Sequence, residues 1–196
     1  MTYGSRTDHY PASSKWLHWL VAICVLVTAA SAVTMDWIVG EGPTQDTLYV
    51  LHESLGPLIL LLMILRLINR LIVGAPMAEP GIAPWQKTVS SIVHGLLYVL
   101  LLVMPVLGYI ANSAYGEPTP VFRLFKVPPA IAKDEALATT LFTMHRWIGW
   151  VVIALVLMHV GAAIYHHLAG DNVLRRMLPQ ALGGAEVAAR APVRSR

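Results

Sequence analysis

The sequence predicts an all-α integral membrane protein built as a four-helix bundle. Three observations carry this prediction: apolar residues make up 56% of the 196-residue chain, charged residues make up only 13%, and the apolar residues gather in four long runs. A soluble domain carries about 25% charged residues. A run of about 20 apolar residues crosses the hydrocarbon core of a bilayer as a helix, because a helix satisfies its own backbone hydrogen bonds in lipid.

The first predicted helix covers about residues 16–37. It follows two basic residues, Arg6 and Lys15, and contains the small residues AASA at positions 29–32. A cleaved signal peptide is therefore the alternative interpretation. The apolar run is long for a signal peptide and opens with WLHW, so we favour a membrane-spanning helix.

The other predicted helices cover about residues 50–73, 88–111 and 140–168. Pro105 lies inside the third helix and predicts a kink, because proline removes a backbone hydrogen-bond donor. The connection between the third and fourth helices is long and rich in proline, and we expect short helical turns there. The four helices form one domain, residues 10–179. The tail, residues 180–196, is expected to be disordered.

The distribution of lysine and arginine predicts the orientation of the four helices. With four spans, the two termini and the connection between the second and third helices share one side of the bilayer. That side carries ten basic residues, and the opposite side carries four. Basic residues favour the cytoplasmic side, so the N and C termini and the tail are expected there. The net charge of +3 is modest, so we expect the lipid bilayer, and no nucleic acid, as a partner.

Four histidines lie in these helices at positions that suggest two pairs. His145 and His159 are fourteen residues apart in the fourth helix, about 21 Å along its axis and on nearly one face. His18 lies at the same depth as His159, near the start of the first helix. His52 lies at the depth of His145, at the start of the second helix. We call His18 and His159 the inner pair, and His52 and His145 the outer pair.

Histidines inside a membrane form hydrogen bonds between helices, relay protons or bind haem iron. Two glycines favour the haem interpretation. Gly56 follows His52 by four residues, and Gly149 follows His145 by four residues, so each shares a helix face with its histidine. A glycine there leaves room for a flat macrocycle, although small residues also allow close helix packing.

Haem propionates are anionic, and three cations lie near the predicted pairs. Lys15 lies one turn before His18, and Arg146 is next to His145. Arg66 lies deeper, on the second helix, and is the strongest candidate for a propionate contact. For all three, extension of the side chain to the lipid headgroups is the alternative.

Three further histidines have no place in the two pairs. His94, in the third helix, is a candidate for a fifth ligand, a quinone contact or a hydrogen bond between helices. His166 and His167 lie about two turns past His159. They are interfacial residues or part of a quinone site, where histidine passes protons near neutral pH.

Together these features resemble the bacterial cytochrome b561 family. They are also similar to the dihaem cytochrome b subunits of nickel–iron hydrogenases and formate dehydrogenases. The resemblance covers about residues 10–179. It rests on KWLHWL (15–20), LHESLG (51–56), HGLLYVLLLVMPVLGY (94–109), MHRWIGW (144–150) and AIYHHLAGDNVLRRMLP (163–179).

The resemblance implies that His18, His52, His145 and His159 bind the iron of two haem b groups. It implies an oxidoreductase of the bacterial inner (plasma) membrane that exchanges electrons with ubiquinone or another quinone. Some family members are thought to oxidise superoxide and reduce ubiquinone. The donor is expected to be a small anion or a protein. Lys126 and Lys133 in the outer loop would attract an anion, but the acidic residues Asp134, Glu135 and Glu117 weaken that attraction.

Two other functional classes remain open at this stage. The chain could be a membrane-anchor subunit that relays electrons between a partner dehydrogenase or hydrogenase and quinone. A transporter or proton channel with histidine relays is the third class, and it would carry no haem.

Overall fold

The computed structural model describes residues 10–74, 76 and 81–179; the predicted tail, residues 180–196, lies outside them. Four long helices make up the described part of the chain: α1 (Ala12–Trp37), α2 (Pro43–Val73), α3 (Pro84–Tyr115) and α4 (Glu135–Leu168). Each is long and apolar enough to cross a membrane. The predicted all-α, four-helix membrane bundle is therefore confirmed.

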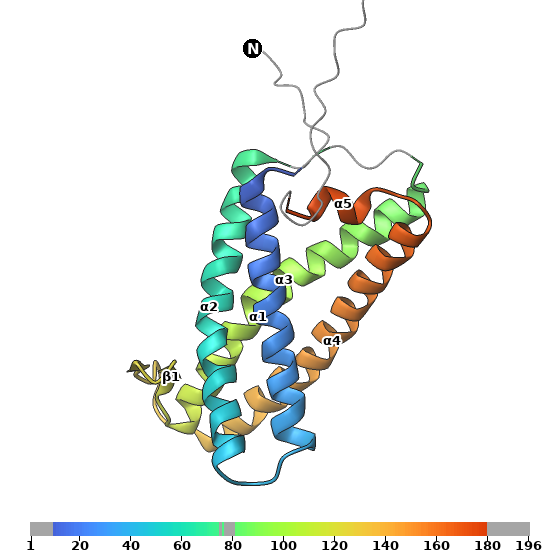
Figure 1. Cartoon of the computed structure of the whole chain (residues 1–196). Helices are drawn as coiled ribbons and strands as arrows, with labels where there is room; N and C mark the ends of the chain where they lie inside the picture. Colours follow the sequence, from blue (N-terminus) through green and yellow to red (C-terminus); the bar gives the residue numbers. More distant parts are fainter. Residues whose placement is uncertain (1–9, 75, 77–80, 180–196) are drawn as a thin grey trace, which may run out of the picture.

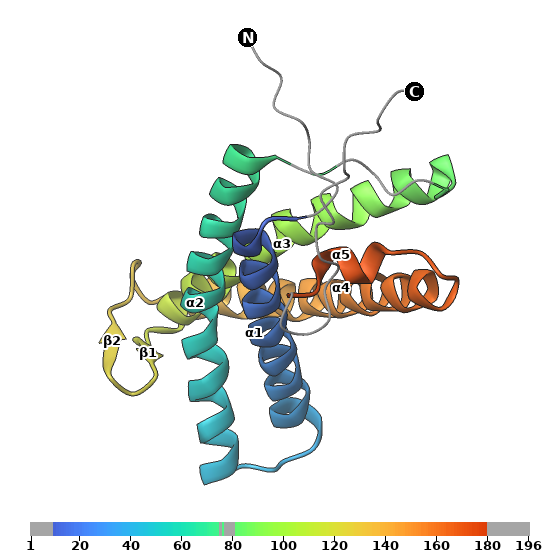
Figure 2. The same ribbon diagram turned by 45° about the horizontal axis from the view of Figure 1, so that its top comes forward.

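The four helices form two antiparallel pairs that cross each other obliquely. α1 packs along α2, α3 packs along α4, and α2 also contacts α3 (Figure 1). A turned view shows α3 and α4 running across α1 and α2 (Figure 2). The end of the bundle where α1 begins, here called the N-terminal end, also holds the short helix α5 (Val173–Met177). The opposite end, called the hairpin end, holds two short strands.

The helices begin earlier than hydrophobicity alone predicted. α2 starts at Pro43 rather than near residue 50, because proline suits the first turn of a helix and the following polar residues continue it. α4 starts after Asp134, whose side chain accepts a hydrogen bond from the N–H of Leu137 (3.0 Å). α3 ends before Gly116, which has a left-handed conformation (φ 96°). Apolar runs mark the lipid-facing part of a helix, whereas capping residues mark its ends.

The connection between α3 and α4 contains a β-hairpin, so the expectation of helical turns there was wrong. β1 (Thr119–Val121) pairs antiparallel with β2 (Phe125–Val127). Four prolines flank or enter these strands, and proline lacks the N–H that a helical turn uses. From α3, the Asn112 side-chain amide donates to Thr119 Oγ1 (3.0 Å) and fixes the hairpin to the bundle.

The buried core is small and lies mainly between α1 and α2. Val21 and Val25 pack there against Leu55, Ile59 and Met63. Elsewhere, large apolar side chains cover the outside of the helices. A continuous apolar surface of this kind is rare on a protein surrounded by water, and it suits contact with lipid.

Candidate functional site

The outer pair lies at the hairpin end, where His52 on α2 faces His145 on α4. The ring centroids of His52 and His145 are 6.0 Å apart, and the rings lie at 76°. Nδ1 of His52 donates a hydrogen bond to the backbone carbonyl of Thr28 on α1 (3.1 Å). Because a carbonyl only accepts, this contact assigns the proton to Nδ1 and leaves the Nε2 lone pair of His52 for a metal.

His145 is positioned by α3. A Cβ atom at Gly108 would lie 3.0 Å from Cε1 of His145, so the imidazole occupies the space that a side chain at position 108 would need. Nδ1 of His145 is buried and has no hydrogen-bond partner in the described part of the chain. The backbone of Met104 is close to this ring, but it lies outside the geometry of a hydrogen bond.

A second buried polar atom lies without a partner at the same site. It is Oγ1 of Thr28, from the residue whose carbonyl accepts the hydrogen bond from His52. Buried polar atoms almost always have partners. The Met104 backbone lies near Nδ1 of His145, so Thr28 Oγ1 is the buried atom here for which no nearby partner is recorded among the described residues.

The inner pair lies at the N-terminal end and includes a third imidazole. The ring centroids of His18 on α1 and His159 on α4 are 6.0 Å apart. The ring of His94 on α3 lies 5.0 Å from that of His159. Nδ1 of His94 donates to the carbonyl of Ser90 (2.6 Å), and the His94 side chain is exposed. The inner pair therefore has an accessible histidine at its edge.

One cation, Arg66, lies beside the inner pair, and a buried cation, Lys15, lies one turn before His18 on α1. Lys15 is only 5% exposed, and no carboxylate in the described residues pairs with it. Arg66 donates to the carbonyl of Ser14 (3.3 Å) and lies over the ring of Tyr98. It is also close enough to the inner pair to interact with it electrostatically. Since a buried cation without an anion is costly, these two positions suit an anionic group such as a propionate.

The other predicted site residues lie in different surroundings. Nη2 of Arg146 is 3.5 Å from Oδ2 of Asp36, and its side chain is 66% exposed, so it pairs with the end of α1. A Cβ at Gly56 would lie 4.0 Å from Pro105, and a Cβ at Gly149 would lie 3.7 Å from Met104. These are ordinary contact distances, and they place both glycines at contacts with α3.

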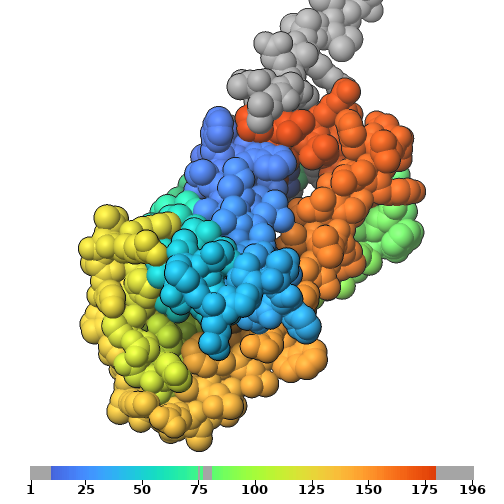
Figure 3. Space-filling view, turned by 60° about the horizontal axis from the view of Figure 1, so that its bottom comes forward, coloured from blue at the N-terminus to red at the C-terminus, as the bar shows by residue number. Residues whose placement is uncertain are grey.

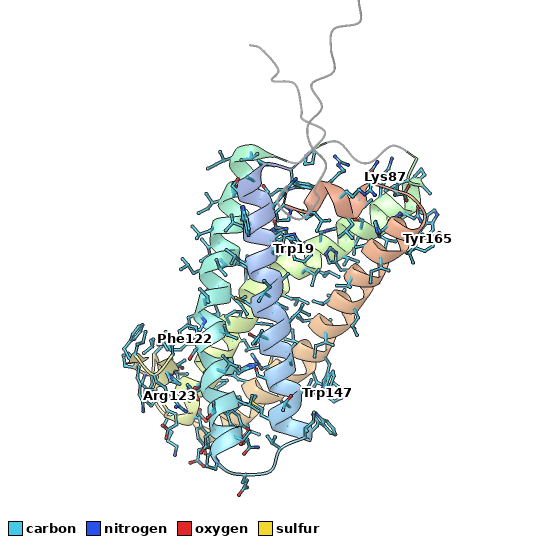
Figure 4. The ribbon with its side chains drawn as sticks, in the orientation of Figure 1. Trp19, Lys87, Phe122, Arg123, Trp147 and Tyr165 are labelled. Atoms are coloured by element: carbon cyan, nitrogen blue, oxygen red, sulfur yellow. The ribbon has the colours of Figure 1, made fainter. Side chains whose placement is uncertain are left out.

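His166 and His167 lie near the end of α4. Nδ1 of His166 is 2.6 Å from Oδ2 of Asp171, and His167 is exposed. Within the described residues, no recorded contact joins either of them to His94. Nearby, the indole N–H of Trp19 on α1 donates to the carbonyl of Met177 on α5 (3.0 Å) and ties α5 across this end (Figure 4).

Both pairs have the spacing that a bis-imidazole metal site requires. A metal–imidazole bond is about 2 Å long and the nitrogen lies roughly 1 Å from the ring centre, so a shared metal holds the two centroids about 6 Å apart. Haem iron accepts neutral imidazole ligands. The spacing of the two histidine pairs and the cation Arg66 near the inner pair therefore fit residues that hold b-type haem.

The interval between the two pairs is apolar. A cavity of about 80 Å³ lies there between α1 and α4, lined by residues such as Val25, Ala29, Val152 and Val156. The space-filling view shows the seam between α1 (blue) and α4 (orange) (Figure 3). Among the described residues, only apolar side chains line this cavity, so the surroundings between the two sites are apolar there.

Two features of the outer site were missed by sequence reasoning. Gly108 belongs to the stretch MPVLG in α3, where a glycine three residues after a proline in an apolar helix is a signal that could have been used. The carbonyl of Thr28 had no such signal, because every residue has a backbone carbonyl.

Four apolar helices that hold two facing histidine pairs at different depths define a membrane cytochrome b. The chain matches the family model described as "Prokaryotic cytochrome b561" over residues 9–180. It therefore belongs to the prokaryotic cytochrome b561 family. It is a multi-pass bacterial membrane protein that binds b-type haem and transfers electrons.

Named relatives match along nearly their whole length. The chain is 31% identical over 179 residues to "Cytochrome b561 homolog 2" of Escherichia coli (strain K12), covering 91% of this chain and 95% of the relative. It is 30% identical to "Cytochrome b561 homolog 1" of the same organism, covering 88% and 98%. It is 29% identical to "Probable superoxide oxidase CybB" of Yersinia pestis, covering 85% and 94%.

Proposed function

We propose that this chain carries electrons across the bacterial inner membrane through two b-type haems and exchanges them with the quinone pool. The observation that carries the proposal is the arrangement on α4. His145 and His159 each face a histidine of another helix at 6.0 Å, about 21 Å apart along one helix. Two haems held in this way supply one-electron couples at two depths of the bilayer.

The side chains around each pair orient the ligands and balance charge. The Thr28 carbonyl fixes the tautomer of His52, and Gly108 leaves space for the ring of His145. Lys15 and Arg66 compensate the negative charge of propionates at the inner site. Both termini and the inner site face the cytoplasm in this proposal, because ten of the fourteen basic residues lie on that side of the predicted topology.

Quinone is proposed to bind beside the inner pair, at His94. This residue is exposed and lies 5.0 Å from the ring of His159. Its Nδ1 is engaged by the Ser90 carbonyl, so Nε2 carries the lone pair. That nitrogen accepts a proton from a quinol or, once protonated, donates one to a reduced quinone. His166 is less suitable, because Asp171 already engages it.

Superoxide is proposed as the electron donor at the hairpin end. The support is the name of one relative, "Probable superoxide oxidase CybB" of Yersinia pestis. Attraction of an anion by the loop is weak. Lys133 is engaged by Glu135 (2.9 Å), and this hydrogen bond raises the pKa of the Lys133 ammonium. Lys126 remains as an exposed cation of β2.

The test is reduction of the purified, haem-loaded protein in liposomes that contain ubiquinone. An enzymatic superoxide source outside the liposomes should reduce the b-type haem and then form ubiquinol. Added superoxide dismutase should abolish both signals. His94→Gln should slow ubiquinol formation several-fold while haem reduction by superoxide persists.

Two outcomes would replace parts of this proposal. In one outcome, superoxide fails to reduce the haem, and a soluble dehydrogenase that co-purifies with the chain reduces it. That result would identify a membrane-anchor subunit instead. Ubiquinol formation at the wild-type rate in His94→Gln would exclude His94 from the quinone site.

A further inference from the structure

The β-hairpin is attached to a face of α2 that the haem sites do not use. Ser54 is completely buried; its Oγ accepts a hydrogen bond from the N–H of Phe122 (2.7 Å) and donates to the carbonyl of Val50 (2.5 Å). Arg123 Nη2 donates to Thr47 Oγ1, one turn before Val50 (3.3 Å). Thr47, Val50 and Ser54 thus form one stripe along α2 that receives the hairpin.

This stripe faces away from the outer pair. His52 and Ser54 are two residues apart on α2, which corresponds to about 200° around a helix. His52 contacts α1 and α4, so the hairpin lies on the other side of α2. Figures 1 and 2 show it beside α2 near the hairpin end of the bundle. A site at the hairpin is therefore separate from the haem ligands.

The tip of the hairpin has a strained backbone. Phe122 and Arg123 both have positive φ angles, 47° and 59°, a region that residues other than glycine rarely adopt. A turn of this type normally uses Asn-Gly or a similar pair. Strained residues persist where their surroundings hold them, and they concentrate at ligand-binding positions.

The side chains of the hairpin combine apolar surface with positive charge. Phe122, Leu124 and Phe125 are 44%, 81% and 59% exposed, and Figure 4 labels Phe122 and Arg123 on this projecting segment. A cavity of about 400 Å³ lies at the hairpin, and Leu124, Phe125, Arg123 and Lys126 line it. No carboxylate lines it, and among the described residues neither cation forms an ion pair.

The length of α2 places its ends outside the hydrocarbon core. α2 has 31 residues, and a helix of that length measures about 46 Å, whereas the hydrocarbon core is about 30 Å thick. The ends of α2 therefore extend into the headgroup layers. The hairpin contacts the first three turns of α2 through Thr47 and Ser54, so we infer that its apolar tip lies at the level where α2 leaves the hydrocarbon core.

We propose that the hairpin, residues 118–127, binds an anionic phospholipid in the adjacent leaflet. Arg123 and Lys126 contact the headgroup phosphate, and Leu124 and Phe125 contact the glycerol region and the upper part of an acyl chain. Aromatic side chains favour this interfacial depth, and basic residues near a membrane surface attract anionic lipids. A soluble acidic partner would not require the apolar tip to lie beside the bilayer.

The experiment counts phospholipids that remain bound to the full-length, haem-loaded protein by native mass spectrometry. The protein is equilibrated with mixed phosphatidylglycerol and phosphatidylcholine before release from detergent. We expect phosphatidylglycerol to be retained preferentially. Arg123→Gln and Lys126→Gln should each reduce that preference, by roughly fivefold per cation. Leu124→Ser should weaken retention of both lipids.

Lys133→Gln is the matched control, because Lys133 lies in the same connection but is paired with Glu135; it should keep the preference. Equal retention of the two lipids by the unaltered protein would overturn the proposal. An unchanged preference in the Arg123→Gln, Lys126→Gln double variant would also overturn it. So would displacement of the lipid by millimolar inorganic phosphate, since that outcome indicates a site for a free anion. None of these measurements depends on electron transfer. The lipid-binding proposal can therefore be overturned while the proposed function stands, and the reverse also holds.

Discussion

The two histidine pairs have the same ring separation, 6.0 Å, but different surroundings. The outer pair is held by hydrogen bonding and packing: the Thr28 carbonyl orients His52 and the Gly108 backbone supports His145. The inner pair has charged and polar neighbours: Arg66 and the exposed His94 interact with it, and the buried Lys15 lies one turn before His18 on α1.

This difference indicates that the two sites use different physical means to hold similar ligands. Packing fixes ring orientation but leaves local charge low. Nearby cations stabilise a reduced haem relative to its oxidised form, because reduction removes one positive charge. We therefore expect the inner haem to have the higher reduction potential, and we expect substitutions to affect the two sites separately.

Among residues that are not predicted ligands, Gly108→Ala has the largest expected effect. The added methyl group would lie 3.0 Å from Cε1 of His145, so the ring must move away from His52. We expect roughly a tenfold loss of affinity for the outer haem, equivalent to about 1.4 kcal/mol. Haem content measured per chain should fall toward one.

Gly161→Ala is the control for this substitution, because nothing lies within 4 Å of a Cβ at that position of α4. It should retain full haem content. Loss of the inner haem in Gly108→Ala, with the outer haem kept, would contradict the assignment of Gly108 to the outer site.

An intermediate effect is expected from Arg66→Gln. Removal of this cation should lower the midpoint potential of the inner haem by roughly 30 to 60 mV, where 59 mV is a factor of ten for a one-electron couple. The outer haem should be unaffected. Potentiometric titration monitored in the visible spectrum resolves the two haems.

Arg70→Gln provides the comparison, since Arg70 lies one turn further along α2 and is exposed. Its effect should be small because water and salt screen an exposed charge. An equal fall in the midpoint potentials of both haems after Arg66→Gln would contradict the assignment of Arg66 to the inner site.

How far the sequence predicts these two regions depends on the kind of interaction that builds them. The helix number follows from hydrophobicity, and the facing of His145 with His52 follows from helix geometry applied to α4. The β-hairpin was not predicted, because Ser54 on α2 and Asn112 on α3 hold it through contacts between segments distant in the sequence. The support of His145 by Gly108 escaped prediction for the same reason.

The smallest expected effect comes from Arg146→Gln. Its guanidinium pairs with Asp36 at 3.5 Å and is largely exposed, and exposed ion pairs contribute about 0–1 kcal/mol. Both haems should remain bound, and the midpoint temperature of thermal unfolding should change little. Release of the outer haem would instead identify Arg146 as a propionate contact and would make the two sites more alike.

The most direct test of the central claim is the number of haems per chain, measured by the pyridine haemochrome assay. The unaltered protein should hold two b-type haems. His18→Ala and His52→Ala should each hold one, and the haems that remain should differ in reduction potential. No haem in the unaltered protein would contradict the whole account, and the same remaining haem in both variants would contradict the assignment of two separate pairs.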